Sequence, residues 1–364
     1  MKKSKGGRIV VKVGSNVLTR SDGTLDITRV SALVDQIIVL RKMNVEVILV
    51  SSGAVAAGKT TVKTRTKLDL VSARQIYSAV GQVRLLNHYY SFFAEYAVSC
   101  GQVLATKEDF STRKHYLNQR NCMKVMLENN IIPIVNENDT ISVDELMFTD
   151  NDELSGLVAT MMNCQKLIIL SNIDGIYDGD PKDKKSKVIQ EIDPENDAIK
   201  DYIQTSRSSA GRGGMQTKYN IARKVAEEGI EVIIANGKKD NILVDLLSDK
   251  ENCIHTRFVP SGEKVSSVKK WIAHSDSFAK GEILINKGAK EALLATQATS
   301  LLPVGIVSIS GFFEEGDIVK IMDEEGAQLG VGRVSCDSET ASSHIGVKNA
   351  KPIIHYDYLY IDIK

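Results

Sequence analysis

The sequence lacks several features that would assign it to a specialised class of protein. Lys and Arg together number 46 and so do Asp and Glu, so no charge excess favours nucleic acid or an anionic membrane as a partner. No stretch approaches the roughly eighteen consecutive apolar residues that cross a bilayer, and the apolar run after the basic N-terminus is too short for a signal peptide. We therefore expect a cytoplasmic protein without a membrane partner, in which any anion is bound locally.

Cysteine is also scarce. The five cysteines are widely spaced, and none belongs to a Cys-x-x-Cys pair or a Cys/His cluster. Disulfide frameworks and zinc sites need such spacing, so reduced thiols are the better interpretation. No side chain is predicted to be a metal ligand.

What the sequence does contain is a repeated alternation of strand-like and helix-like segments. Its 364 residues exceed what one hydrophobic core usually supports, so two domains are expected. Helical periodicity, for example over residues 27–43 and 119–129, separates short β-branched runs, which predicts a mainly parallel open α/β sheet sandwiched by helices. The predicted strands are Ile9–Val13, Val45–Val50, Val103–Ala105, Ile131–Val135, Leu167–Leu170 and Val232–Ala235.

The pattern changes in the last quarter of the chain. The alternation fades after about residue 236, and short strand-like runs punctuated by glycine follow, which predicts a small β-rich domain. We place a catalytic domain at residues 1–260, a linker at about 261–276 and the β-rich domain at 277–364. The predicted strands of the second domain are Gly281–Ile285, Gly305–Gly311, Asp317–Ile321 and Gly330–Val334.

One segment matches the P-loop pattern of nucleotide-binding proteins. Residues 53–60 read Gly-Ala-Val-Ala-Ala-Gly-Lys-Thr after a predicted strand. The alanines favour a regular helix, and strand Leu167–Leu170 ends in Ser171-Asn172 rather than in the Asp that holds magnesium in P-loop enzymes. We therefore predict a helix that begins at Ser52-Gly53, and no P-loop.

Lys12 lies inside the first apolar strand, just before the small residues Gly14 and Ser15. A lysine in such a run is costly unless its charge meets a partner. The functional hypothesis is an ammonium that faces phosphoryl oxygens, assisted by the amides of Gly14 and Ser15. The alternative is an edge lysine whose long side chain reaches solvent.

Polar residues follow two other strands. Ser52, after the second strand, can cap the next helix, whose free N–H groups can hold an anion. The fourth strand ends in Asn136-Glu137-Asn138-Asp139-Thr140, and Asp150-Asn151-Asp152 follows at a helix start. Such clusters are common in ordinary turns, but at one edge of a sheet they could hold the ammonium and carboxylate of an amino acid.

A glycine-rich segment, residues 208–218, leads into a predicted helix over Tyr219–Glu228. Such glycines permit close backbone approach to phosphate, and Lys218 sits in the first helical turn, where a cation opposes the helix dipole unless an anion is present. The alternative is a flexible linker.

Taken in order, these motifs resemble the amino acid kinase family and, within it, the glutamate 5-kinases. They are Lys12-x-Gly14-Ser15, Ser52-Gly53-Ala54, residues 135–139, residues 150–152 and Gly213-Gly214-Met215-x-Thr217-Lys218. Residues 300–306 and 313–317 resemble the PUA domain that many bacterial members carry.

The resemblance implies ATP-dependent phosphorylation of the γ-carboxylate of L-glutamate to L-glutamyl 5-phosphate, the first step of proline biosynthesis, with Mg²⁺ accompanying ATP. The implied catalytic residues are Lys12, Lys218 and Asp152, with Asp152 orienting the lysines. The implied substrate-binding residues are Ser52, Gly53, Asn136, Asp139 and Asn151. The implied ATP-binding residues are Lys12, Gly14, Ser15, Ser171, Asn172, Arg212, Gly213, Gly214, Met215, Gln216, Thr217 and Lys218.

Two departures from the family pattern concern the nucleotide. The family often has Thr-Asp at Ser171-Asn172 and Gly-Thr-Gly-Gly at residues 211–214, so nucleotide preference stays open. Alternative functions are a kinase of the same family acting on N-acetylglutamate, aspartate or a nucleoside monophosphate, or RNA binding through the PUA domain. Residues 277–364 carry eight Lys and Arg against twelve Asp and Glu, which argues against RNA.

The resemblance also implies partners that the residues themselves do not specify. These are a homo-oligomer, dimeric or tetrameric, feedback inhibition by proline, and association with glutamyl-phosphate reductase.

Since a carboxylate is ionised at neutral pH, the reaction needs no general base, which agrees with the absence of a candidate catalytic histidine.

Overall fold

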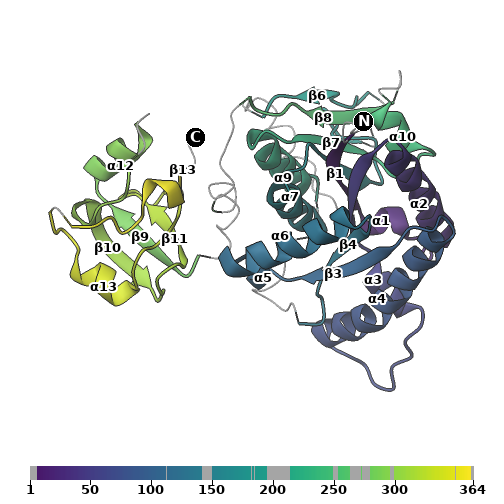
Figure 1. Cartoon of the computed structure of the whole chain (residues 1–364), viewed down its shortest axis with the longest axis horizontal. Coiled ribbons are helices and arrows are strands. Elements are labelled where there is room, and N and C mark those ends of the chain that lie inside the picture. The colour runs from purple at the N-terminus through teal and green to yellow at the C-terminus, as the bar shows by residue number, and fades with distance from the viewer. Residues whose placement is uncertain are drawn as a thin grey trace. The chain divides into compact units, whose positions relative to one another are not determined.

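The computed structural model describes residues 6–111, 113–141, 150–181, 183, 185–194, 214–248, 253–262, 272, 279–295, 299–348 and 350–361. The chain divides into two compact units, Met1–Thr106 with Gln119–Lys264 and Lys107–Asn118 with Val265–Lys364. Each unit contains one of the two sheets in Figure 1. Among the described residues no helix is long and apolar enough to cross a membrane.

The first unit is built on a mainly parallel sheet, as predicted. Its eight described strands lie in the order β3-β4-β2-β1-β5-β7-β8-β6, and all neighbours are parallel except β7 and β8. The strands are β1 (Gly6–Val13), β2 (Val45–Ser51), β3 (Cys100–Ala105), β4 (Ile132–Glu137), β5 (Lys166–Ser171), β6 (Glu191–Ile192), β7 (Glu231–Asn236) and β8 (His255–Phe258). The prediction that the alternation fades after residue 236 was wrong, because β8 returns antiparallel to β7 and extends the sheet.

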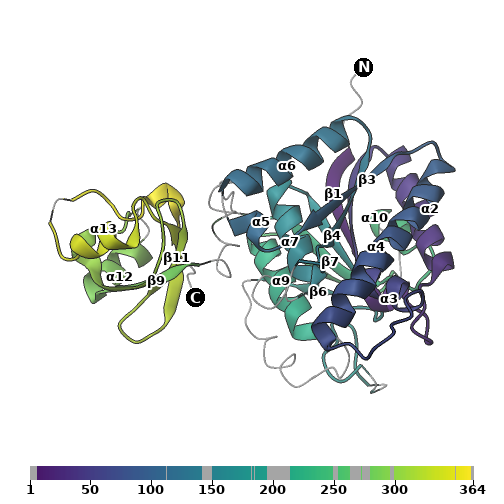
Figure 2. The ribbon, with the colours of Figure 1, turned by 90° about the horizontal axis from the view of Figure 1, so that it is seen from below.

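Helices cover both faces of this sheet (Figures 1 and 2): α2 and α4 lie on one face, and α7 and α9 lie on the other. The described helices of the first part of the chain are α1 (Ser15–Leu18), α2 (Ile27–Lys42), α3 (Ala54–Lys59), α4 (Leu70–Ala94), α5 (Glu108–Ser111), α6 (Arg113–Glu128), α7 (Asn151–Met161), α9 (Met215–Glu227) and α10 (Ile242–Leu247). Helix α2 matches its predicted range within one residue, whereas α6 begins before its predicted range.

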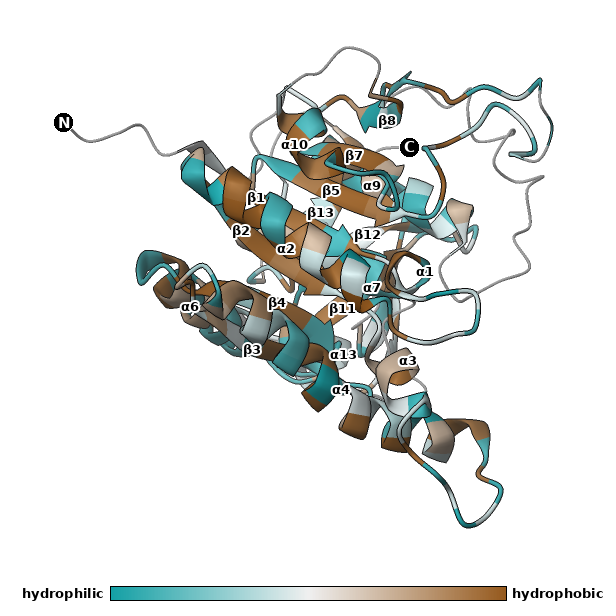
Figure 3. Ribbon diagram, turned by 90° about the vertical axis from the view of Figure 1, so that its right-hand side faces the viewer, coloured by the Kyte–Doolittle hydropathy of each residue, from teal (hydrophilic) through white to brown (hydrophobic). Residues whose placement is uncertain are grey.

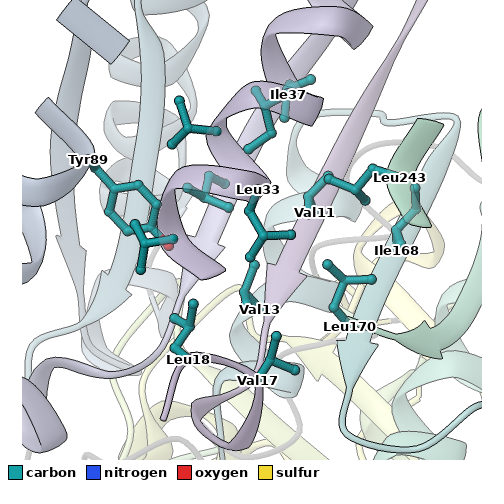
Figure 4. Close-up of a cluster of buried hydrophobic side chains, with 14 of the residues drawn as sticks. Val11, Val13, Val17, Leu18, Leu33, Ile37, Tyr89, Ile168, Leu170 and Leu243 are labelled. Atoms are coloured by element: carbon teal, nitrogen blue, oxygen red, sulfur yellow. The ribbon is translucent and has the colours of Figure 1, made fainter. Parts of the chain in front are cut away.

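The central strands are hydrophobic over most of their length, because both faces of the sheet are covered (Figure 3). Successive side chains of a strand point to opposite faces. Val11 and Val13 of β1 therefore pack into a core with Leu33 and Ile37 of α2 and with Tyr89 of α4 (Figure 4). Lys12 lies between Val11 and Val13 in the sequence, and so its side chain emerges on the opposite face.

The segment that matches the P-loop pattern is a helix, as predicted. Gly53 is the N-cap of α3 with φ 104°, a left-handed conformation that glycine adopts without strain. Helices α3 and α4 pack backbone to backbone, since a Cβ at Gly58 or Gly81 would overlap backbone atoms of the other helix. Lys59 is exposed at the end of α3, so these residues form no phosphate-binding loop.

The second unit is β-rich, as predicted. Its five described strands lie in the order β10-β9-β11-β12-β13 and enclose an apolar core that includes Ile283, Phe313 and Ile354. The strands are β9 (Gly281–Ile285), β10 (Ile306–Gly311), β11 (Ile318–Met322), β12 (Gln328–Arg333) and β13 (Leu359–Ile361), with helices α12 (Lys287–Leu294) and α13 (Ser338–Ser343). The 3-10 turns Pro303–Gly305 and Tyr356–Tyr358 precede β10 and β13.

Candidate active site

The candidate site lies where the carboxyl ends of β1, β2, β4 and β5 meet. Strand β1 is paired with β2 on one side and with β5 on the other, so the chain changes direction across the sheet at this point. In open α/β sheets, such an edge is where ligands bind. The residues predicted from the strand ends are therefore brought to one region of the first unit.

A buried carboxylate joins the two predicted catalytic lysines. Asp152 is completely buried, and its two oxygens lie 2.5 Å from Nζ of Lys12 and 2.9 Å from Nζ of Lys218. Lys12 comes from β1, Asp152 from the first turn of α7 and Lys218 from α9. The alternative of an edge lysine reaching solvent is wrong, since Lys12 is only 4% exposed.

The local charges explain the state of this carboxylate. Burial alone would raise the pKa of Asp152, but the ammonium groups of Lys12 and Lys218 outweigh that effect and hold its pKa well below the usual range. The neighbouring Asp150 caps α7 through the backbone N–H groups of Asp152 and Glu153. Burial, followed by the negative charge of Asp152, raises the pKa of Asp150 to about 7.

Helix α9 begins earlier than predicted. Gly214 is its N-cap, and so Met215, Gln216 and Thr217 are helical instead of belonging to a glycine-rich loop. The first N–H groups of an α-helix have no partner inside the helix and can donate to an anion. The first turn of α9 thus presents amides beside Lys218. Arg212 and Gly213 lie outside the described residues.

The residues after β1 and β5 are placed at the same sheet edge, with one correction. The N–H of Gly14 donates to the carbonyl of Leu170 at 3.1 Å. The prediction that this amide contacts a phosphate was therefore wrong. A Cβ at Gly14 would approach Nζ of Lys12 to 3.6 Å, so the absent side chain leaves room beside the ammonium. Ser171 is buried at the end of β5 and Asn172 is exposed.

Three of the predicted substrate-binding side chains contact one another. Nδ2 of Asn151 donates to Oγ of Ser52 at 2.9 Å and to Oδ1 of Asn136 at 3.0 Å. Ser52 therefore does not cap the helix that follows it, because the N-cap of α3 is Gly53, without a side-chain hydrogen bond. This group is polar and uncharged.

Asp139, the fourth predicted substrate-binding side chain, is held by helix α4. Nε of Arg74 donates to Asp139 at 2.8 Å, and Nη2 of the same arginine contacts both Asp139 and Glu137, the latter at 3.0 Å. The hydroxyl of Ser78 donates to the other oxygen of Asp139 at 3.0 Å. Two carboxylates, Asp139 and Glu137, therefore meet one guanidinium at this corner, and carboxylate oxygens suit an ammonium ligand.

Sequence reasoning missed the contribution of α4. Arg74, Ser78 and Gln82 are spaced by four residues, which places them on one face of the helix. Arg74 and Ser78 both contact Asp139, and Gln82 contacts Asn136. Four-residue spacing of polar groups on a helix is a signal that could have been used.

A sequence model of the amino acid kinase family matches residues 7–236, which include every described residue of this site. The chain belongs to the amino acid kinase family. A second model, that of the PUA domain, matches residues 281–355 in the β-rich unit. The fold and domain types predicted from the sequence are confirmed.

Relatives within this family match over almost the whole chain. A protein of Bacteroides thetaiotaomicron named glutamate 5-kinase is 64% identical over 98% of both chains. A second glutamate 5-kinase, from Chlorobaculum tepidum, is 47% identical over 97% of both. Among solved structures, a carbamate kinase from Giardia lamblia bound to AMP-PNP matches 71% of this chain and 100% of its own with a TM-score of 0.51 at 18% identity, which supports the fold alone.

Proposed function

We propose that this chain transfers the γ-phosphoryl group of ATP to the γ-carboxylate of L-glutamate, giving L-glutamyl 5-phosphate and ADP, the first step of proline biosynthesis. The names of relatives as much as 64% identical support this reaction. The structural observation that carries it is the pairing of Lys12 and Lys218 by Asp152, which concentrates two ammonium groups at the carboxyl edge of the sheet.

The chemistry that this site must perform is the joining of two anions. A γ-carboxylate oxygen attacks the γ-phosphorus, and the bond from that phosphorus to the β–γ bridging oxygen breaks as ADP leaves. The carboxylate is already ionised, because its pKa of about 4.3 lies far below neutral pH, so no base is needed. Lys12 and Lys218 neutralise charge on the transferred group, and Asp152 orients both.

The remaining residues divide between the two substrates. Ser52, Asn151 and Asp139, with the backbone of Gly53, surround the amino acid, and Asn136 acts through its contact with Asn151. The amides of Met215, Gln216 and Thr217 at the start of α9, with Gly214 and the amide of Ser15, receive the ATP phosphates. The family resemblance also implies ATP binding by Ser171, Asn172, Arg212 and Gly213.

Mg²⁺ is proposed to arrive with ATP. Among the described residues, no group of three or more His, Cys, Asp or Glu side chains is placed to hold a metal ion. We propose no protein ligand for Mg²⁺, because this ion is usually bound by substrate phosphates with few protein ligands. It would supply further neutralisation of phosphate charge.

The experiment is ADP release from Mg-ATP with L-glutamate, in the presence of hydroxylamine to trap the acyl phosphate as hydroxamate. We expect hydroxamate that depends on glutamate, and none with N-acetylglutamate, aspartate or a nucleoside monophosphate. Turnover with one of those acceptors and not with glutamate would refute the proposed substrate. ADP release without hydroxamate would refute carboxylate phosphorylation.

The finer proposals concern assembly and regulation. We propose a catalytic domain at residues 1–260, a PUA-like domain at 277–364 with a structural or regulatory role, a homo-oligomer, feedback inhibition by proline, and transfer of the reactive acyl phosphate to a reductase. Addition of L-proline to the hydroxamate assay tests the regulation. Gel filtration with light scattering tests the assembly, and a pull-down tests the reductase.

A further inference from the structure

Four uncharged side chains from four different parts of the chain form one series of hydrogen bonds. Nδ2 of Asn136 donates to Oε1 of Gln82 at 2.8 Å, and Oδ1 of Asn136 accepts from Nδ2 of Asn151 at 3.0 Å. Nδ2 of Asn151 also donates to Oγ of Ser52 at 2.9 Å. We call Gln82, Asn136, Asn151 and Ser52 the amide relay.

A backbone group determines the direction of every bond in the amide relay. The N–H of Glu137 donates to Oδ1 of Asn136 at 2.9 Å, and a backbone N–H can only donate. The oxygen of Asn136 must therefore face Glu137 and Asn151, while its NH₂ group faces Gln82. Gln82 must in turn direct its oxygen toward the NH₂ group of Asn136. A flip of either side-chain amide would place two donors against each other.

The direction of these bonds specifies what the amide relay presents to a ligand. Both hydrogens of Nδ2 of Asn151 are used, one by Ser52 and one by Asn136. Oδ1 of Asn151 is buried and, among the described residues, has no hydrogen-bond partner. The oxygen of Ser52 accepts from Asn151, so the hydroxyl hydrogen of Ser52 is left to point elsewhere. The relay thus offers one acceptor and one donor.

We propose that Gln82 is a positioning residue that, through Asn136, holds the amide of Asn151 so that its oxygen accepts from the α-ammonium of the substrate while the Ser52 hydroxyl donates to a substrate carboxylate. This inference rests on the proposed function, and it makes the amide relay a determinant of selectivity for an amino acid with a free amine. The neighbouring carboxylates support it, because Asp139 and Glu137, both held by Arg74, lie close to Asn136 in the chain and are suited to an ammonium ligand.

Gln82 is suited to this role by its position. It is 8% exposed and lies on α4, which is packed backbone to backbone against α3 and therefore has little freedom to move. Removal of its oxygen leaves the buried NH₂ of Asn136 without that acceptor, which is unfavourable. Asn136 must then turn toward another acceptor, and Asn151 loses the contact that aims its oxygen.

The test is Gln82→Met, which keeps the length of the side chain and removes the acceptor. We expect KM for L-glutamate to rise about tenfold, the size expected for one misdirected hydrogen bond to a charged group, while KM for ATP stays within about twofold. Glutarate, which lacks the ammonium, is measured as a competitive inhibitor. Its inhibition constant should change by less than about threefold, because the acceptor of Asn151 has nothing to bind in it.

Two further variants separate positioning from general damage. Gln36 is a matched control, since it is a buried glutamine on α2 whose Oε1 accepts from the N–H of Leu243 and whose Nε2 donates to the carbonyl of Ala32, neither of which belongs to the site. Gln36→Met should lower thermal stability and leave the glutamate KM unchanged. Gln82→Glu keeps an acceptor oxygen for Asn136 and should keep KM within about threefold of wild type.

The outcomes are distinguishable. Each of three results would overturn the proposal. The first is an unchanged glutamate KM in Gln82→Met, and the second is an equal rise in the glutamate KM and the glutarate inhibition constant. The third is a Gln82→Glu variant with a glutamate KM as high as that of Gln82→Met. If Gln82→Met does not fold, a glutamate KM of Gln82→Glu more than about threefold above wild type overturns the proposal. A wild-type protein that forms no hydroxamate from glutamate would overturn the proposed function and this inference together, whereas an active wild type confines any failure to the amide relay.

Discussion

The replacement of Asp152 by asparagine removes one negative charge without changing the shape of the side chain. Asp152 is completely buried, and the side chains of Lys12 and Lys218 are 5% and 11% exposed. An asparagine has one acceptor oxygen, so it can accept from only one of the two ammonium groups, and it turns its NH₂ group toward the other.

The expected loss of stability is large for a single isosteric change. Removal of one partner from a buried ion pair costs about 3–5 kcal/mol, because the remaining charge is left uncompensated. Asp152 contacts two buried ammonium groups, so we expect a loss within that range. Typical domains are stable by only about 5–15 kcal/mol, so Asp152→Asn should unfold at a markedly lower urea concentration.

Asp174→Asn provides the control for this experiment. Asp174 also contacts a lysine, Lys239, at 2.9 Å, but this pair is 27% and 38% exposed. An exposed pair contributes about 0–1 kcal/mol. Urea unfolding followed by circular dichroism should therefore separate the two variants. Equal losses, or a loss below about 1 kcal/mol for Asp152→Asn, would refute the argument that burial makes the Asp152 pair special.

Three further predictions concern neighbouring residues. Lys218→Ala should lower kcat by about 10²–10³, the usual effect of removing one preorganised charge from a transition state; a fall below about tenfold in the hydroxamate assay would contradict this role. Lys12→Ala should abolish turnover while Lys59→Ala stays within about twofold of wild type, because Lys59 is exposed at the end of α3; the reverse would restore the P-loop hypothesis. Asp150→Asn should stabilise the protein relative to wild type, and more so as the pH rises. Because the pKa of Asp150 is raised to about 7 in the folded protein, folding favours the neutral acid, and wild-type stability falls between about pH 4 and pH 7. The asparagine variant has no such group and lacks that loss. The difference in melting temperature should grow over this interval and level off above it, and a constant difference from pH 5 to pH 8 would show that the pKa of Asp150 is not raised.

Local sequence predicted the strands well because their signal is local. Short β-branched runs between helical segments predicted six strands of the first unit, and each lies within a few residues of an observed strand, β1 to β5 and β7. Strands β6 and β8 were not predicted. The boundaries of α9 were predicted less well. Glycine and polar residues before Tyr219 favour a loop, but Gly214 supplies an N-cap, and Tyr219, Ala222 and Val225 are buried on one side of the helix.

The end of the sheet was misjudged for a different reason. Strand β8 has only four residues, His255–Phe258, with alternating burial, and its pattern is weaker than that of the central strands. Its pairing with β7 is antiparallel, unlike that of the other neighbours in the sheet, and follows the short helix α10. Helix α4 was overlooked as a source of site residues because the partners of Arg74, Ser78 and Gln82 lie 65, 61 and 54 residues away in the sequence.

The amino-acid sequence alone determined the classes of chemistry available to this protein, because each signal could be interpreted from its immediate neighbours. These signals are Lys12 in an apolar strand, Gly214 before a helix and Asp139 after a strand. The sequence also determined the family, because these motifs occur in a fixed order. Only the tertiary structure decided which groups meet. Asp152 joins Lys12 and Lys218, Arg74 holds Asp139, and Gln82 directs Asn136, in each case across long stretches of chain. Such pairings depend on how helices pack on the sheet, and the direction of a hydrogen bond depends on its neighbours in space, neither of which a local pattern encodes.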